Sequence, residues 1–229
     1  MPAARRFFVN NQGLAKDLVL VDAEHNHLAN VLRLRTDDEV IVVCGDEFDY
    51  YYEITEIKKS QTKLTFAKKQ PNIHNPKHKL TVYMGVIKHD NLALAVEKLN
   101  EIGATELVLF KSAYSQNLPV KLDKLQTAAQ QSCKQCGRSI PLEVSGVLTF
   151  DEFLKAIPKN TVFADEKEKS LKINSADAAI IGPEGGFTDA EREILRKIAS
   201  PVSLGARILR AETAAIVGAS LILSELGEI

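Results

Sequence analysis

The sequence is poor in cysteine, with only three in 229 residues. That number is too small for the disulfide framework that supports small secreted proteins. Cys133 and Cys136 are spaced as C-x-x-C, but no second pair accompanies them, and the five histidines show no ligand-like spacing beside them. A structural zinc site needs about four ligands. The pattern favours incidental thiols over metal or redox chemistry, and we expect no metal site.

The sequence also lacks an apolar run long enough to span a bilayer, which takes about 20 residues. Its longest apolar stretch, 214–223, contains Gly218 and Ser220 and is typical of a buried or interface helix. Arg5 and Arg6 near the start are not followed by the apolar segment of a signal peptide. We therefore expect a cytoplasmic protein with no membrane partner.

Neither sign of charge predominates. Lys and Arg total 29 against 30 Asp and Glu, so the formal net charge is -1. This excludes a globally basic nucleic-acid binder, but not a local basic face balanced by acidic residues elsewhere. The 45% hydrophobic and 26% charged residues are typical of a globular chain, and the length allows one large domain or two small ones.

The first seventy residues are predicted to form mostly short strands. These strands are expected at 7–9, 18–21, 40–43, 50–54 and 64–66. Asp22 is predicted to cap a short helix with Leu28, Val31 and Leu32 on one face. Several short strands separated by turn signals favour a small β-barrel.

A domain boundary is predicted within 71–79, which has two prolines and little apolar content. After it, apolar strands alternate with helical patterns. Strands are expected at 80–87, 106–110, 161–164, 178–181 and 201–204, and helices at 90–102, 121–135, 188–199 and from 213. Asp90 and Thr213 are the expected caps of two helices, Gly103 closes one, and Thr188 with Glu191 fits a capping box. Strands this apolar predict an α/β domain with a mostly parallel sheet covered on both faces.

A glycine-rich loop, Gly182–Gly186, follows the strand expected at 178–181. Glycines let the backbone approach a ligand closely. However, the chain contains neither the phosphate-loop motif nor the dinucleotide motif. Glu184 inside the loop would repel a pyrophosphate. A ribose, an adenine edge or a positive centre fits better, and a purely structural turn is the alternative.

A second loop brings Arg207 and Arg210 to the start of the last helix. Capping and the helix dipole account for Glu212 and Thr213, but not for two arginines beside them. An arginine fork suits a phosphate or a base edge. A surface ion pair is the alternative reading.

These two loops resemble the signature of the small-subunit ribosomal-RNA methyltransferase E family. The matching runs are 181–188 with Glu191, and 203–214. Further similarity covers 5–9, 27–33, 97–103, 131–132, 137–139 and Pro141. The resemblance implies a PUA-like β-barrel over 1–72 and a SPOUT methyltransferase domain over 73–229, with a deep trefoil knot in roughly 160–229. It also implies a homodimer that uses S-adenosylmethionine to methylate N3 of a uridine in small-subunit (16S) ribosomal RNA within an assembled particle.

The same resemblance assigns residues to roles. The expected cofactor contacts are Glu166, Ile181, Gly182, Pro183, Glu184, Gly185, Gly186, Leu204, Gly205, Ile208, Leu209 and Thr213. Arg210 is expected to stabilise negative charge on the uracil or a flanking phosphate, with help from Arg138, whereas no residue stands out as the general base. Basic and aromatic groups can hold phosphates and stack on bases. On that ground the expected RNA contacts are Arg5, Arg6, Phe8, Arg33 and Arg35, with a core phenylalanine and solvated arginines as the alternative.

The chain departs from the family at Tyr114, where an arginine is usual. A tyrosine can stack on a base or donate a hydrogen bond, but it cannot neutralise a phosphate. The role usually given to that arginine is therefore in doubt. Two other readings stay open: a methyltransferase that acts on tRNA, and a non-catalytic RNA-binding protein with a decayed cofactor domain.

Overall fold

The computed structural model describes residues 5–9, 14–170, 173 and 175–229, and the chain forms two compact units. The first unit comprises residues up to 75 together with 130–141, and the second comprises 76–129 and 142–229. The segment 130–141, which the sequence analysis assigned to the second domain, thus belongs to the first unit. Hydrogen bonds account for this, because Asn72 donates to the carbonyl of Gly137 at 2.8 Å and Asn75 donates to Ser139 at 2.8 Å.

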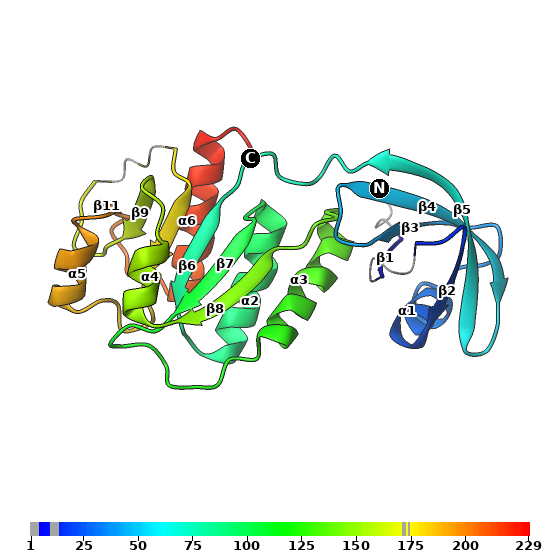
Figure 1. Ribbon diagram of the computed structural model, residues 1–229, viewed down its shortest axis with the longest axis horizontal. Helices are drawn as coiled ribbons and strands as arrows, with labels where there is room; N and C mark the ends of the chain where they lie inside the picture. Colours follow the sequence, from blue (N-terminus) through cyan, green and yellow to red (C-terminus); the bar gives the residue numbers. More distant parts are fainter. Residues whose placement is uncertain (1–4, 10–13, 171–172, 174) are drawn as a thin grey trace. The chain divides into compact units, whose positions relative to one another are not determined.

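A curved five-stranded sheet forms the body of the first unit (Figure 1). Its strands are β1 (Arg6–Phe8), β2 (Asp17–Val21), β3 (Glu39–Val43), β4 (Phe48–Ile57) and β5 (Gln61–Pro71), in the order β1-β3-β4-β5-β2. The β1–β3 pair is parallel and the other pairs are antiparallel. Alternate residues enter a core that includes Phe7, Val42, Tyr52, Ile54 and Leu64. The five strands expected from the sequence are therefore present.

The helix after β2 differs from the prediction. It consists of α1 (Asp22–Asn26) and a π-helical turn, His27–Val31, and Val21 stands at the cap position without a side-chain hydrogen bond. Leu28 is buried, but Val31 is 63% exposed. In a π-turn the hydrogen bonds connect residues five apart. The expected i, i+3 and i+4 positions therefore do not share one buried face, and the predictions of the Asp22 cap and of that face are wrong.

The second unit is built on six parallel strands. They are β6 (Thr81–Gly85), β7 (Glu106–Phe110), β8 (Glu143–Leu148), β9 (Thr161–Ala164), β10 (Ala178–Ile181) and β11 (Ser200–Val202), in the order β11-β9-β10-β6-β7-β8. Every neighbouring pair is parallel. The predicted parallel sheet is confirmed, with β8 as a strand that the sequence analysis missed.

Helices cover both faces of this sheet, as predicted (Figure 1). One face packs on α2 (His89–Ile102), α3 (Leu122–Cys136) and α6 (Ala211–Glu225). The other face packs on α4 (Phe150–Ala156) and α5 (Asp189–Leu195), with Phe110 and Phe153 stacked at 3.9 Å between ring centroids. Strands buried on both faces explain why β6 and β10 are continuous apolar runs.

The helix ends follow the predicted chemistry only in part. Thr188 and Glu191 form the expected capping box on α5, and Gly103 closes α2 in the left-handed conformation. Asp90 and Thr213 are not caps: α2 begins after Lys88 and α6 after Arg210, so both side chains lie within the first turn. Helix α5 ends at Leu195, earlier than the expected 199.

Two kinds of feature are absent from the described residues: a membrane-spanning helix and a cluster of metal-binding side chains. No helix in that part of the chain is long and apolar enough to cross a membrane. Within the same residues, no group of three or more His, Cys, Asp or Glu side chains is placed to hold a metal ion. The knot expected in roughly 160–229 stays a prediction.

Candidate functional site

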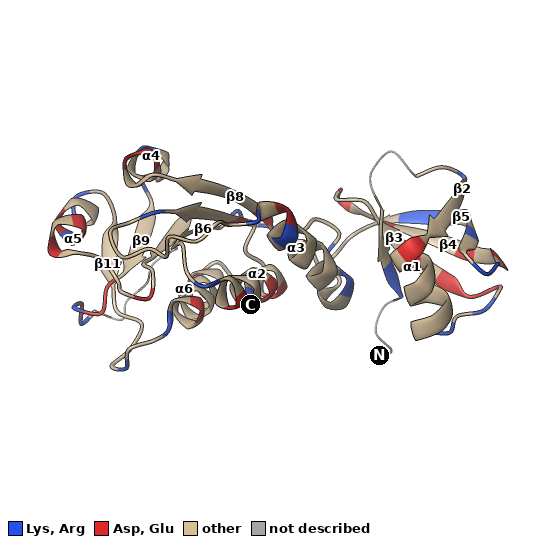
Figure 2. Cartoon of the chain, turned by 90° about the horizontal axis from the view of Figure 1, so that it is seen from below, with Lys and Arg blue, Asp and Glu red and all other residues tan. Residues whose placement is uncertain are grey.

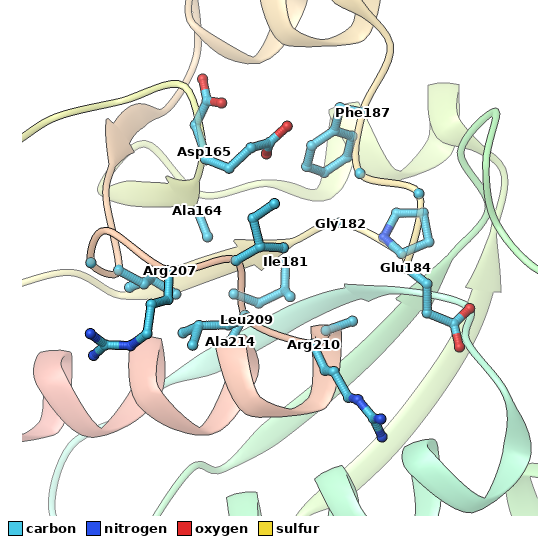
Figure 3. A pocket seen from close by; sticks show the side chains of 18 of the residues that line it. Ala164, Asp165, Ile181, Gly182, Glu184, Phe187, Arg207, Leu209, Arg210 and Ala214 are labelled. Carbon is cyan, nitrogen blue, oxygen red and sulfur yellow. The ribbon is translucent and has the colours of Figure 1, made fainter.

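A cavity of about 470 Å³ opens where three neighbouring strands of the second unit end (Figure 3). Residues directly after β9 and β10 line it, and so does the loop that connects β11 to α6. Because the strands are parallel, their carboxyl ends meet at one edge of the sheet, which is where α/β folds bind ligands. The volume lies within the roughly 300–1,000 Å³ of small-molecule sites.

The glycine loop after β10 forms one wall, and its glycines are required by close packing. A side chain on Gly85 at the end of β6 would lie 2.6 Å from Cδ of Pro183, and one on Gly182 would lie 3.0 Å from the ring of Phe187. Gly186 has a positive φ of 68°, and its N–H closes a turn to the carbonyl of Pro183 at 2.8 Å. The loop is therefore a tight, fixed turn whose backbone faces the cavity.

The loop between β11 and α6 forms the opposite wall. Leu204 packs toward the backbone of Gly218 in α6, and Ile181, Leu209 and Ala214 supply apolar surface between the two walls (Figure 3). Ile208 is 90% exposed although it is strongly apolar. Apolar surface between two loops suits the face of an aromatic ring system.

Acidic residues after β9 form the third side, and Arg192 on α5 and Arg196 at its C-cap hold them. Asp165 is buried, and Arg192 and Arg196 both pair with it. Arg192 also pairs with both oxygens of Glu166, and its Nε donates to the carbonyl of Phe187 at 3.2 Å. Burial opposes charge on Arg192, but Glu166 and Asp165 hold its pKa above the usual value. One guanidinium thus joins the end of β9 to the glycine loop.

The charges around the cavity define what it can accept. Asp165, Glu166 and Glu184 contribute carboxylates, whereas Arg207 and Arg210 extend from the second loop at opposite ends of the cavity (Figure 3). Carboxylates repel phosphate oxygens and attract hydroxyl hydrogens or a positive centre. Arg192 and Arg196 already pair with Asp165, and Arg192 pairs with Glu166, whereas Glu184 accepts a hydrogen bond from the neutral amide of Gln116. These carboxylates can accept hydrogen bonds from ribose hydroxyls, and the charge of Glu184 favours a positive centre beside it.

The structure places eleven of the twelve expected cofactor residues on the cavity walls. These are Glu166, Ile181, Gly182, Pro183, Glu184, Gly185, Gly186, Leu204, Gly205, Ile208 and Leu209. Thr213 does not line the cavity, since it is exposed at the third position of α6. Contact with a cofactor stays a prediction for all twelve.

The two residues expected to be catalytic lie in different units. Arg210 lines the cavity at the cap position of α6 and is exposed. Arg138 belongs to the first unit, is 2% exposed, and donates through Nε to the carbonyl of Ile140 at 3.0 Å. Burial lowers its pKa. Within the first unit, the guanidinium of Arg138 therefore forms a buried hydrogen bond to the backbone, which is a structural contact.

The residues expected to contact RNA are divided by their exposure. Arg33 and Arg35 are exposed, and Arg5 is exposed but paired with Asp38 at 2.9 Å. Phe8 is half-buried. Arg6 is 4% exposed and forms two hydrogen bonds with Asp49, at 2.7 and 2.8 Å. A buried guanidinium that is paired in this way is not available to a phosphate, so this geometry argues against the RNA contact expected of Arg6.

Charge on the first unit is mixed, as the near-zero net charge suggests. Figure 2 shows acidic residues among the lysines and arginines of the β4–β5 region. Lys69 lies 3.7 Å from the ring centroid of Phe48, and Lys68 lies 4.6 Å from that of Tyr51. Sequence reasoning did not single out this group.

Sequence reasoning also missed several pocket residues. The missed lining residues are Ala164 and Asp165, whereas five others lie in the two predicted loops but were given no cofactor contact: Phe187, Ala206, Arg207, Ala211 and Ala214. Asp165 had a detectable signal, because two acids in succession follow the predicted strand 161–164. Arg192 had none, since a single arginine on a predicted helix is ordinary.

The segment 112–116 is attached by hydrogen bonds to the glycine loop and to α5. Gln116 donates to Glu184 at 3.0 Å, and the backbone N–H of Ala113 donates to Glu191 at 2.9 Å. Tyr114 lies between these bonds, and its Cβ is 2.8 Å from where a side chain on Gly185 would begin. Its side chain is nevertheless exposed. Tyr114 therefore sits on the outer side of the glycine loop.

Two family models match the chain. An RNA methyltransferase domain matches residues 74–223, and an RNA methyltransferase PUA domain matches residues 21–66. The first covers the whole cavity, and the second covers most of the curved sheet. The curved sheet is therefore PUA-like, as expected from the sequence.

Relatives and a solved structure match over almost the full chain. The Ribosomal RNA small subunit methyltransferase E of Rickettsia conorii is 30% identical over 92% of this chain and 91% of its own. The protein of the same name from Helicobacter pylori strain 26695 is 32% identical over 91% of this chain and 96% of its own. A crystal structure of the Neisseria gonorrhoeae protein, bound to S-adenosyl methionine, is 21% identical and covers 96% of this chain and 97% of its own, with a TM-score of 0.83.

Proposed function

This chain belongs to the ribosomal RNA small subunit methyltransferase E family, and we propose that it transfers a methyl group from S-adenosylmethionine to N3 of a uridine in small-subunit ribosomal RNA. The observation that carries the proposal is the cavity between the two family-matching loops, at the carboxyl ends of β9, β10 and β11. Family membership narrows the reaction to RNA methylation. The cavity supplies the place for the methyl donor.

The residues of the cavity fit S-adenosylmethionine, which when bound supplies an electrophilic methyl group on a sulfonium centre. Its ribose hydroxyls match the carboxylate of Glu166, which Arg192 holds from behind. Its adenine matches the apolar surface of Ile181 and Leu209, and the glycine loop allows close backbone approach. Its positive charge is favoured beside the carboxylate of Glu184, which accepts a hydrogen bond from the neutral amide of Gln116. The similar Neisseria gonorrhoeae structure, which is bound to S-adenosyl methionine, supports this choice.

The chain itself has to expose the target base and stabilise its deprotonated form. A stacked base costs a few kcal/mol to extrude, and a base in an open loop costs less. N3 of uridine carries a proton, and negative charge develops on the ring when that proton leaves. We assign the stabilisation of this charge to Arg210, because its exposed guanidinium stands at the mouth of the cavity. The general base remains unassigned.

The same reading extends to partners. We propose a homodimer, because the resemblance implies one and because exposed leucines, Leu94 and Leu221, lie on the packed helices α2 and α6. We propose that the substrate is the assembled small subunit, which places the enzyme in the cytoplasm. Sedimentation of the purified protein measures its oligomeric state.

The role of Arg210 is tested by methyl transfer in vitro. Purified protein, radiolabelled S-adenosylmethionine and small subunits from a strain that lacks this gene are combined, and N3-methyluridine is quantified in the RNA. Arg210→Ala should lower kcat by about 10²–10³, as expected when one donor to a developing anion is removed. Arg207→Ala is the matched control, because it changes an arginine on the same loop at the other end of the cavity.

The binding of the cofactor provides the second readout. Calorimetry should give Arg210→Ala a dissociation constant for S-adenosylmethionine close to that of the unchanged protein. Near-normal turnover by Arg210→Ala would overturn its assignment. Absence of cofactor binding by the unchanged protein would instead favour a non-catalytic RNA-binding protein. Methylation of tRNA but not of ribosomal RNA would identify tRNA as the substrate.

A further inference from the structure

Tyr114 is an exposed aromatic residue that packs against the glycine loop. Its side chain is 54% exposed, although tyrosine is a large and largely apolar group. The ring begins directly against the loop backbone: a side chain on Gly185 would lie 2.8 Å from Cβ and 3.2 Å from Cγ of Tyr114. Gly185 itself lines the cavity. The tyrosine therefore packs against a residue of the cavity wall.

The segment that carries Tyr114 is held in place along its length. The N–H of Ser112 donates to the hydroxyl of Ser115 at 2.9 Å, and the N–H of Gln116 donates to the carbonyl of Val86 at 3.0 Å. These bonds add to those from Gln116 to Glu184 and from Ala113 to Glu191. Ala113 and Gln116, on either side of Tyr114, are thus anchored to α5, to the glycine loop and to Val86 directly after β6. Such a support presents the tyrosine ring with little freedom of its backbone.

From this geometry we infer that Tyr114 stacks on an unpaired base of the RNA beside the cavity and positions the substrate there. An exposed aromatic ring on a rigid support is the usual platform for an unpaired base. A tyrosine carries no charge with which to hold a phosphate, so a base face is the partner that its chemistry selects. The inference rests on the proposed function, since it takes RNA as the ligand. Tyr114 acts through the position of the base and not as a catalytic residue.

Three substitutions test the inference. Tyr114→Phe keeps the ring and removes the hydroxyl, whereas Tyr114→Leu keeps apolar bulk against Gly185 and removes the ring. Leu118→Ala is the matched control, because Leu118 is 47% exposed in the same connection and carries no ring. All three and the unchanged protein are compared for KM and kcat on small subunits from a strain that lacks the gene.

If Tyr114 stacks on a base, KM should rise in the variant that loses the aromatic ring and not in the variant that keeps it. Tyr114→Leu should raise KM for the subunit roughly 5- to 150-fold, the range for one base–aromatic stack. Tyr114→Phe and Leu118→Ala should stay within about threefold of the unchanged protein on the same scale. The dissociation constant for S-adenosylmethionine should be the same in all four. Unchanged KM in Tyr114→Leu overturns the inference, and so does a loss confined to cofactor affinity.

A binding measurement separates this inference from the proposed function. Fluorescence anisotropy with a labelled single-stranded uridine oligonucleotide requires no methyl transfer. Tyr114→Leu should bind it more weakly than Tyr114→Phe by the same factor, even if the unchanged protein proves inactive on small-subunit RNA. Equal binding by the two variants would overturn the inference, whereas a wholly inactive unchanged protein that still shows this difference would overturn only the proposed function.

Discussion

At the scale of the residue, the site depends on one buried guanidinium. Arg192 contacts Asp165, both oxygens of Glu166 and the carbonyl of Phe187. Arg196, at the C-cap of the same helix, shares Asp165 with it and also pairs with Glu168. The two arginines thus differ in a single respect that matters for the cavity, which is the hold on Glu166 and the glycine loop. That difference allows a controlled experiment.

Lysine at these positions tests whether Glu166 is held for the cofactor. Lysine keeps the positive charge near buried Asp165 but loses the forked geometry that binds two groups at once. Arg192→Lys should weaken S-adenosylmethionine binding about tenfold, or 1.4 kcal/mol. Arg196→Lys should change it by less than about threefold on that scale. Calorimetry measures both dissociation constants, with thermal unfolding recorded to identify a folding defect. Equal losses in the two variants would contradict the special role of Arg192.

At the scale of the element, the parallel sheet and its helices were accessible from the sequence, and the missed elements have specific causes. Strands β6 and β10 are recognisable from the sequence, because burial of both faces makes their sequences nearly continuous apolar runs. Strand β8 was missed because Gly146, with φ of 101°, interrupts its pattern, and the register shifts at Leu109 opposite it. A side chain at Gly146 would lie 2.3 Å from the carbonyl oxygen of Leu109. Only the partner strand explains that glycine.

The candidate site likewise has parts that local sequence predicts and parts that depend on contacts between distant segments. The glycine loop and the Arg207–Arg210 loop were predictable, because glycines and paired arginines at strand ends are unusual in a purely structural turn. The link from α5 to the end of β9 was not, because it joins Arg192 to residues 26 and 27 positions earlier. Contacts between segments so far apart depend on the fold and have no local pattern.

The chain just after α6 is fixed to the segment before β6 by one carboxylate. Glu228 accepts hydrogen bonds from the N–H groups of Lys77 and His78, each at 2.8 Å, and from the imidazole of His78 at 2.7 Å. Burial opposes the charged form, but these hydrogen bonds hold the pKa of Glu228 below its usual range. A depressed folded-state pKa stabilises the folded protein above the unfolded-state pKa, and this stabilisation is lost as the pH falls through the folded-state value.

Glu228→Gln should therefore lower the free energy of unfolding by about 1 kcal/mol near pH 7, a value at the low end for hydrogen bonds to a charged group because the contact lies near the surface. The difference from the unchanged protein should shrink below about pH 4.5, where the unfolded state takes up the proton. Urea unfolding between pH 3.5 and 7.5 measures it. A difference that stays constant over this range, or grows toward acid, would refute the account.

At the scale of the whole molecule, the two units have distinct constructions that match distinct tasks. The first is a curved sheet in which opposite charges are interspersed and Arg6 is buried (Figure 2). The second has its cavity at the carboxyl edge of a parallel sheet. A net charge of -1 does not identify an RNA-binding protein, and the groups that we propose to contact RNA are local: Tyr114 and Arg210 near the cavity, with exposed Arg33 and Arg35 on the first unit. The net charge of the whole chain does not reveal such local groups, because acidic residues elsewhere balance them.

The central claim, methylation of N3 in small-subunit ribosomal RNA, is tested most directly by mass spectrometry of that RNA from cells that lack this gene. RNA from the deletion strain should lack one N3-methyluridine that the parent strain contains. A plasmid that carries the gene should restore it, whereas the Arg210→Ala gene should not restore it to more than a small fraction. An unchanged content of N3-methyluridine in the deletion strain would contradict the account.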